Sequence, residues 1–164
     1  MSNFNPIFLD DLIDYVYGDK PKILLEFIKK SALTTKESKG DLWEKALDKA
    51  MDHTELLPAN TPHMDFDDTS DAKFCTVTRY SGDGRFEATI GGISAKKGPL
   101  RVCICLDLPG TSKKKLYFLL IPYEFYSKRK GTNLKVYFKN YIPYGDIWNR
   151  FRCSWKEVIS PIKV

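Results

Sequence analysis

The N-terminal third of the chain carries apolar residues at the three- and four-residue spacing of helices. A first helix is expected over residues 6–18, where an Asn-Pro pair is typical of a helix start, and a second over residues 19–31. A third is expected to begin at Asp41, because Asp41 and Glu44 have the spacing of a capping box. Its apolar stripe would consist of Trp43, Leu47, Ala50 and Met51. The sequence therefore predicts three helices ahead of any strand.

From residue 63 onward the apolar positions change to the two-residue period of β-strands, and Gly- and Pro-containing turns interrupt the pattern. Strands are expected over residues 63–67, 71–79, 85–93, 100–107, 115–121 and 134–138. Those over 100–107 and 115–121 are apolar on both faces, which predicts that they are central strands covered on one side by the N-terminal helices.

Helices followed by strands predict the α/β (α+β) class, with N-terminal helices packed on a central mixed, mostly antiparallel β-sheet. A chain of 164 residues is long enough for one compact domain. We therefore expect a single domain over 1–164, with a helical part (1–54), a sheet core holding the candidate active site (63–138) and a C-terminal segment (139–164). That last segment is expected to form one short helix, from the spacing of Trp148, Phe151 and Trp155.

The first two predicted strands carry the candidate chemistry. Alternation places Asp65 and Asp67 on one face of the first strand, and Asp71 and Lys73 on the same face of the second. A three-residue loop over 68–70 would pair the two strands so that three carboxylates and one ammonium form a single patch. Such a loop prefers Gly at a left-handed position, and this loop has none, so some strain is expected there.

Around these residues the chain resembles the PD-(D/E)XK nuclease superfamily, which includes many type II restriction endonucleases. Asp71-Ala72-Lys73 matches the second half of that motif, and Asp65 is the candidate first acid, with Met64 where the motif has proline. The substitutes for the first acid are Asp67 and Asp68. The run over 93–102, followed by 116–122, is also similar to the sheet that follows the site in small restriction enzymes, so that the resemblance covers roughly residues 40 to 125.

The resemblance implies a restriction-endonuclease-like fold and an endonuclease that hydrolyses DNA phosphodiester bonds with Mg²⁺ or Mn²⁺, in restriction or phage defence. Asp65, Asp71 and the Ala72 carbonyl would bind the metal, and Lys73 would orient or deprotonate the attacking water. Two further acids could join the metal site, Asp67 and Glu44. The capping-box spacing gives Glu44 a structural role as the alternative. Concerted cutting of both strands would need a homodimer.

The net charge of +5 is distributed unevenly along the chain. Residues 1–72 hold 8 Lys, no Arg and 15 acidic residues, a net charge of −7, whereas residues 73–164 hold 18 basic and 6 acidic residues, a net charge of +12. A phosphate backbone is the natural partner of such a basic half. The candidate DNA-binding residues are Arg79, Arg85, Lys96, Lys97, Arg101, Lys113, Lys114, Lys115, Lys128, Arg129 and Lys130.

Other features of the sequence argue against several classes of protein. Two histidines are too few for an HNH nuclease, and no Gly-rich phosphate loop of the Walker type occurs. The four cysteines lack the spacing of zinc sites and are expected to be free and buried. No apolar run approaches the roughly 20 residues that cross a bilayer, so a cytoplasmic protein with no membrane partner is expected. Two alternatives to a nuclease stay open: a non-catalytic nucleic-acid-binding module, and a regulator that binds protein through its acidic N-terminal helices.

Overall fold

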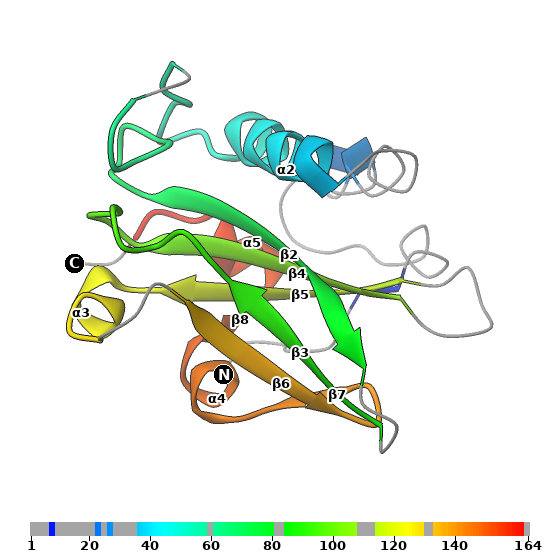
Figure 1. The fold of residues 1–164 in the computed structure, drawn as a ribbon. Helices are drawn as coiled ribbons and strands as arrows, with labels where there is room; N and C mark the ends of the chain where they lie inside the picture. Colours follow the sequence, from blue (N-terminus) through cyan, green and yellow to red (C-terminus); the bar gives the residue numbers. More distant parts are fainter. Residues whose placement is uncertain are drawn as a thin grey trace.

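A curled, mixed β-sheet forms the centre of the computed structural model, and helices lie on both of its sides (Figure 1). The structure describes residues 7–8, 22–23, 26–27, 36–58, 61–80, 84–107, 114–129 and 133–162. The strands are β1 (Ile7–Phe8), β2 (Asp71–Tyr80), β3 (Arg85–Ile90), β4 (Leu100–Asp107), β5 (Lys114–Ile121), β6 (Leu134–Lys139), β7 (Ile142–Tyr144) and β8 (Arg152–Cys153). The helices are α2 (Lys36–Ala50), α3 (Tyr123–Tyr126), α4 (Asp146–Phe151) and α5 (Trp155–Val158), and residues 22–23 and 26–27 are also helical.

The strand order is β1-β5-β4-β2-β3-β6-β7, with β8 paired to β5. The β2–β4 pair is parallel and the other pairs of named strands are antiparallel, which confirms a mixed, mostly antiparallel sheet. The predicted strands from 71 to 138 are confirmed to within a few residues, and the expected central strands, β4 and β5, have both faces buried.

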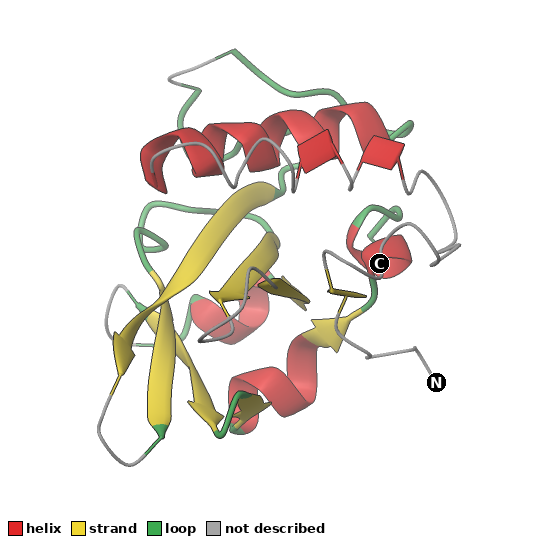
Figure 2. Cartoon of the chain, turned by 90° about the vertical axis from the view of Figure 1, so that its right-hand side faces the viewer, coloured by secondary structure: helices red, strands yellow, loops and turns green. Residues whose placement is uncertain are grey.

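One hydrophobic core lies between α2 and the sheet, and Figure 2 shows α2 extending across this side. The apolar stripe predicted for the third helix is buried here, and Trp43 donates a hydrogen bond from Nε1 to the Arg101 carbonyl at 3.1 Å. Trp43 also packs against Phe118 of β5 and Trp155 of α5. Cys103 and Cys105 of β4 are buried in this core.

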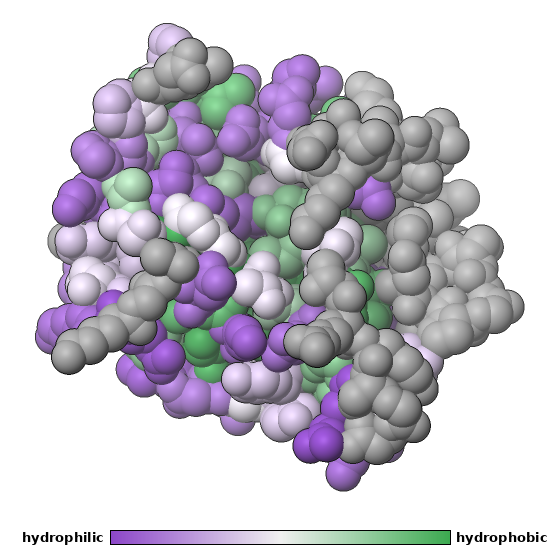
Figure 3. Space-filling model, in the orientation of Figure 1, coloured by the Kyte–Doolittle hydropathy of each residue, from purple (hydrophilic) through white to green (hydrophobic). Residues whose placement is uncertain are grey.

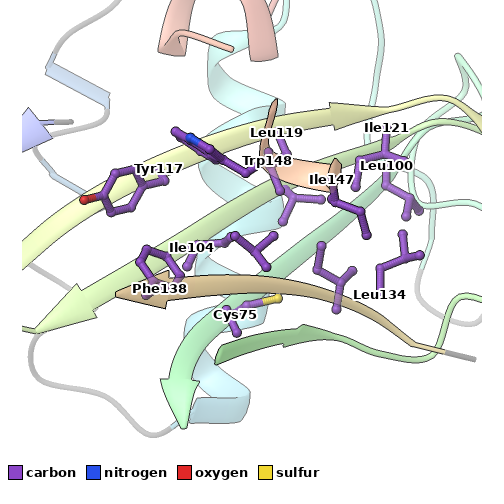
Figure 4. Close-up of a cluster of buried hydrophobic side chains, with 14 of the residues drawn as sticks. Cys75, Leu100, Ile104, Tyr117, Leu119, Ile121, Leu134, Phe138, Ile147 and Trp148 are labelled. Carbon is purple, nitrogen blue, oxygen red and sulfur yellow. The ribbon is translucent and has the colours of Figure 1, made fainter. Parts of the chain in front are cut away.

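The second core lies inside the curl of the sheet, where β3 and β6 turn over the opposite face of β4 and β5 (Figure 4). Ile104 reaches it from β4, Phe138 from β6 and Trp148 from α4. Strand β6 alternates buried and exposed residues, so that it seals this core on one side and meets solvent on the other. The four cysteines all lie in the described part of the chain, where they are buried and form no disulfide, as expected.

Two of the predicted helices differ from the structure. Residues 7–8 form β1 against β5, so the helix predicted over 6–18 is wrong there, and its remaining residues lie outside the described part of the chain. The third helix begins at Lys36 rather than Asp41, which leaves Asp41 inside the helix and removes the predicted capping box. Asp41 instead pairs with Lys45 one turn later, at 3.1 Å on the exposed surface.

The C-terminal segment forms two short helices rather than one. The chain leaves α4 to pair with β5 through β8, and Ser154 then starts α5 with a capping box to Glu157. This break sends Trp148 into the core inside the curl and Trp155 into the core beneath α2. Helical spacing alone could not reveal that the two tryptophans face opposite sides of the sheet.

The predicted hairpin between 63–67 and 71–79 is also wrong. Residues 63–67 form no strand, and their one β contact is an isolated bridge between Leu56 and Phe66. The N–H groups of Asp65 and Phe66 both bond to the Ser70 carbonyl at 3.1 Å, which closes a tight turn before any ladder can form. Thr69 in that turn has φ +71°. The loop was expected to need one residue in this left-handed conformation, and a threonine adopts it here because the loop has no Gly.

Candidate active site

Asp71 is the first residue of β2 and the centre of the candidate site. Its side chain is 1% exposed, and its N–H bonds to the Pro99 carbonyl at 2.9 Å. Two ammonium groups flank the carboxylate: Lys96 Nζ lies 2.9 Å from Oδ1 and Lys73 Nζ lies 3.5 Å from Oδ2. These are ion-pair contacts, since neither oxygen accepts a well-directed hydrogen bond from the described residues. A buried carboxylate whose two oxygens accept no well-directed hydrogen bond can still bind a further ligand, such as a cation.

Asp65 is held beside Asp71, although not through the predicted strand pairing. Its Oδ2 accepts a hydrogen bond from the Ala72 N–H at 2.9 Å, which fixes the carboxylate at the start of β2. Burial, and next the neighbouring Asp65 carboxyl, raise the pKa of Asp71 to about 6. Two carboxylates so placed repel each other unless a proton or a cation lies between them.

Lys96 supplies part of that positive charge. Burial by itself lowers the pKa of Lys96. The contact with Asp71 and the charges of Asp65 and Glu44 raise that pKa by more than burial lowers it, so the net shift is upward. Lys96 is among the residues predicted to bind DNA, and the structure places its ammonium group against Asp71. No local pattern could have indicated this, because the contact joins the loop before β4 to the start of β2.

Lys73 follows Asp71 by two residues on β2, and its side chain reaches the loop before β4, which also carries Lys96. Its Nζ donates to the Gly92 carbonyl at 3.5 Å, in addition to the ion pair with Asp71. Gly92 has φ +65°, and a Cβ there would lie 3.5 Å from Lys73 Nζ. The loop therefore brings its backbone close to the lysine at a position that suits Gly.

Glu44 approaches the cluster from α2. Its pKa is raised by burial and then by the charges of Asp41 and Asp71, whereas the charges of Lys96 and Lys73 lower it. The side chain is thus within electrostatic reach of the buried carboxylate. Since α2 begins before Asp41, the capping role predicted as the alternative for Glu44 is absent, and its charge acts on the cluster from α2.

The two substitutes for the first acid, Asp67 and Asp68, lie elsewhere. Asp67 accepts a hydrogen bond from the Thr54 hydroxyl and another from the Glu55 N–H, the latter at 3.0 Å, so it faces the preceding loop. Asp68 accepts from Arg101 Nη2 at 2.8 Å and from Ser70 Oγ at 2.5 Å. The expectation that Asp67 shares one patch with Asp65 and Asp71 is therefore wrong.

The prediction that Arg101 binds DNA is wrong, because its side chain is fully buried. Besides Asp68, its guanidinium donates to Ser70 Oγ at 3.1 Å and to the carbonyls of Val158 and Ser160. These bonds connect the loop before Asp71 to the C-terminal segment. The role of Arg101 is structural.

The remaining candidates for DNA binding differ in exposure. Arg85, Lys97, Lys128 and Arg129 are exposed, and Lys115 is half-buried. The side chains of Arg79 and Lys114, and the whole of Lys113 and Lys130, lie outside the described part of the structure. The described helices include none that is long and apolar enough to cross a membrane.

The donor atoms of the cluster suit Mg²⁺ better than a softer metal. Within the described residues no three His, Cys, Asp or Glu side chains converge into a closed metal site. Mg²⁺ does not require one, since proteins commonly hold it with one or two carboxylates, waters and substrate phosphates. The buried oxygens of Asp71 and the adjacent Asp65 carboxylate are ligands of that kind. The residues present therefore fit Mg²⁺ in donor chemistry and charge.

Comparisons of the chain with protein-family models, with curated protein sequences and with solved structures find no match in any of the three.

Proposed function

We propose that the protein is a metal-dependent endonuclease that hydrolyses DNA phosphodiester bonds. The observation that carries this proposal is the Asp71 carboxylate, buried beside Asp65 and in contact with two ammonium groups. Acids and lysines in a buried cluster are expensive to maintain, and such groups concentrate at functional sites. A solvated hairpin with surface ion pairs, the simplest alternative, would leave Asp71 exposed.

Asp65 and Asp71 would hold Mg²⁺ or Mn²⁺, with the Ala72 carbonyl and Glu44 as further ligands. When bound, the metal supplies a Lewis acid that offsets negative charge on the reacting phosphate. Asp65 orients the start of β2 through the Ala72 N–H, and this keeps the two carboxylates side by side. In this scheme Asp67 is not a ligand, because its Oδ1 already accepts two hydrogen bonds from residues 54 and 55.

Lys73 would act on the attacking water. Its ammonium lies at the edge of the cluster, 3.5 Å from both Asp71 Oδ2 and the Gly92 carbonyl, so a water beside Asp71 would be within its reach. A positively charged lysine there would orient the water and stabilise the charge that develops on the phosphate oxygens. Lys96 would add a second positive charge on the opposite oxygen of Asp71.

The resemblance of Asp71-Ala72-Lys73 to the PD-(D/E)XK motif supports the same reaction class. A restriction-endonuclease-like fold, a homodimer and a role in restriction or phage defence belong to this proposal as the resemblance implies them. The basic second half of the chain, with its net charge of +12, supports DNA as the substrate.

The test is cleavage of supercoiled plasmid DNA by purified protein with Mg²⁺, Mn²⁺ or EDTA. Asp71→Asn and Lys73→Ala should each lower the cutting rate by about 100-fold or more while leaving DNA affinity nearly unchanged. The matched controls are Glu87→Gln and Lys135→Ala, which remove the same kinds of group from the surface pair between β3 and β6. Cutting in EDTA, or equal losses in the control variants, would refute the proposed site. Salt-sensitive DNA binding without any cutting would favour a non-catalytic binding module instead.

A further inference from the structure

A pocket of about 350 Å³ opens next to the carboxylate cluster, between the loop before β4 and the segment around α3. Its volume lies in the range of small-ligand sites. Lys96, Lys97 and Arg129 line it, together with Tyr123, Tyr126 and Ile93. Figure 3 shows mainly hydrophilic residues on the left-hand side of the molecule, where Figure 1 places α3.

The topology of the sheet explains why this pocket and the cluster are neighbours. The register places Asp71 opposite Leu100 on β4, and Leu100 opposite Ile121 on β5. Helix α3 begins two residues after Ile121, at the same end of the sheet as the start of β2 (Figure 1). Lys96 belongs to both features, because it lines the pocket and its Nζ lies 2.9 Å from Asp71 Oδ1.

The charge of the lining indicates an anionic occupant. Three cationic side chains and no carboxylate line the pocket. Lys97 is exposed, and its backbone N–H bonds to the His63 carbonyl at 3.4 Å. The Arg129 guanidinium lies over the Phe125 ring at 4.4 Å from its centroid, and its only described ion pair, to Asp146, is long at 3.8 Å. Both groups can therefore bind a phosphate without breaking a strong contact.

The two tyrosines give the pocket an aromatic wall. Tyr126 is buried and its hydroxyl donates to the Gly98 carbonyl at 2.5 Å, which ties α3 to the loop before β4. Tyr123 is half-buried and meets the Tyr126 ring edge to face, with centroids 5.3 Å apart. Tyr126 therefore has a structural role, because it connects α3 to the loop before β4. Tyr123 is the ring on which a planar group can stack.

We infer that this pocket binds one unstacked nucleotide of a single-stranded nucleic-acid segment. Its phosphate would lie between Lys97 and Arg129 and its base against Tyr123. The inference rests on the proposed nuclease function and narrows its substrate class. A base reaches an aromatic side chain in a pocket of this size only after leaving the helical stack, which favours a single strand, a flap or a frayed end over intact duplex. The next phosphate along the strand would then lie at Asp71, because Lys96 borders both places.

The test is binding rather than cleavage, measured in EDTA by fluorescence anisotropy with a labelled ten-nucleotide oligo(dT) strand and a labelled ten-base-pair duplex. The wild-type protein should bind the single strand about tenfold more tightly than the duplex. Tyr123→Leu, which keeps an apolar side chain but removes the ring, should weaken single-strand binding by about tenfold and duplex binding much less. Lys97→Gln combined with Arg129→Gln should likewise weaken single-strand binding by about tenfold.

The matched control is Lys139→Gln combined with Lys156→Gln, which removes the same charge from exposed positions outside the pocket. Equal losses in the control and pocket variants, or a loss that is the same for both probes, would overturn the inference. Cleavage that depends on Asp71 but shows no preference for single strands would support the nuclease proposal and refute the role of the pocket. Single-strand binding that depends on Tyr123 in a protein that never cuts would support the pocket and refute the nuclease.

Discussion

Replacing the central carboxylate of the cluster should make the protein more stable. In wild type, burial and the Asp65 carboxyl raise the pKa of Asp71 from 3.8 to about 6. Between these two pH values the folded state binds more protons at this position than the unfolded state does. The stability of the fold therefore falls as pH rises through this window, and the full cost of the ionised carboxylate is present above pH 6. Asp71→Asn removes the charge and keeps the shape of the side chain.

The size of the effect follows from the difference between the two pKa values, which corresponds to about 3 kcal/mol. The 1% exposure of the side chain leaves little water to screen the charge. The contacts with Lys96 and Lys73 are already part of this net shift, because both lysines lower the pKa of Asp71. Asp71→Asn should thus be about 1 to 3 kcal/mol more stable than wild type at pH 7.5 in EDTA.

Urea denaturation followed by circular dichroism at several pH values between 4 and 7.5 measures this difference. The gap between Asp71→Asn and wild type should widen as pH rises, whereas Glu87→Gln on β3, whose ion pair with Lys135 is long at 3.5 Å, should track wild type throughout. Adding Mg²⁺ at pH 7.5 should stabilise wild type and not Asp71→Asn, because a ligand that binds only the folded state raises its stability. A variant that is less stable than wild type at pH 7.5, or a gap that does not change with pH, would refute the reasoning.

Two further predictions concern the loop before Asp71. Arg101→Met should destabilise the fold by about 3 to 5 kcal/mol in urea denaturation, because it leaves Asp68 without its buried partner; a loss under about 1 kcal/mol would contradict the structural role. Gly98→Ala should cost about 2 kcal/mol or more, since its Cβ would lie 1.8 Å from the Thr69 carbonyl oxygen. Gly40→Ala, with open space around it inside α2, should instead stabilise by about 0.5 to 1 kcal/mol, and equal effects at the two glycines would refute the packing argument.

Much of the sheet could be predicted from the sequence because its signals are local. Strand β4 reads as apolar on both faces and is buried on both, and β6 alternates in sequence as it does in burial. The prediction for the C-terminal segment is wrong because its structure depends on a contact between distant parts of the chain. Trp148 and Trp155 have helical spacing, but the pairing of β8 with β5 separates them, and that pairing joins parts of the chain far apart in sequence.

The candidate site was predictable in its residues rather than in its arrangement. Asp65, Asp71 and Lys73 do lie together, yet through a tight turn and a side-chain hydrogen bond instead of a β-ladder. Glu44 was given a capping role because Asp41 stands three residues before it, and the earlier start of α2 removes that role. Lys96 carried no local signal, since only the parallel pairing of β2 and β4 brings its loop to Asp71.

The hydrogen bonds behind the cluster explain how two repelling carboxylates stay together. Arg101 pairs with Ala72 in the register of β2 and β4, and its guanidinium binds Asp68 and Ser70 on one side and the C-terminal carbonyls on the other. The close approach of Gly98 to Thr69 restrains the same turn from the loop before β4. These contacts restrain the start of β2 without involving the Asp71 or Asp65 carboxylates, and their favourable energy offsets the repulsion between those two groups. A charged pair that is held in place by the rest of the fold, rather than by its own attraction, is suited to receive a cation without first having to assemble.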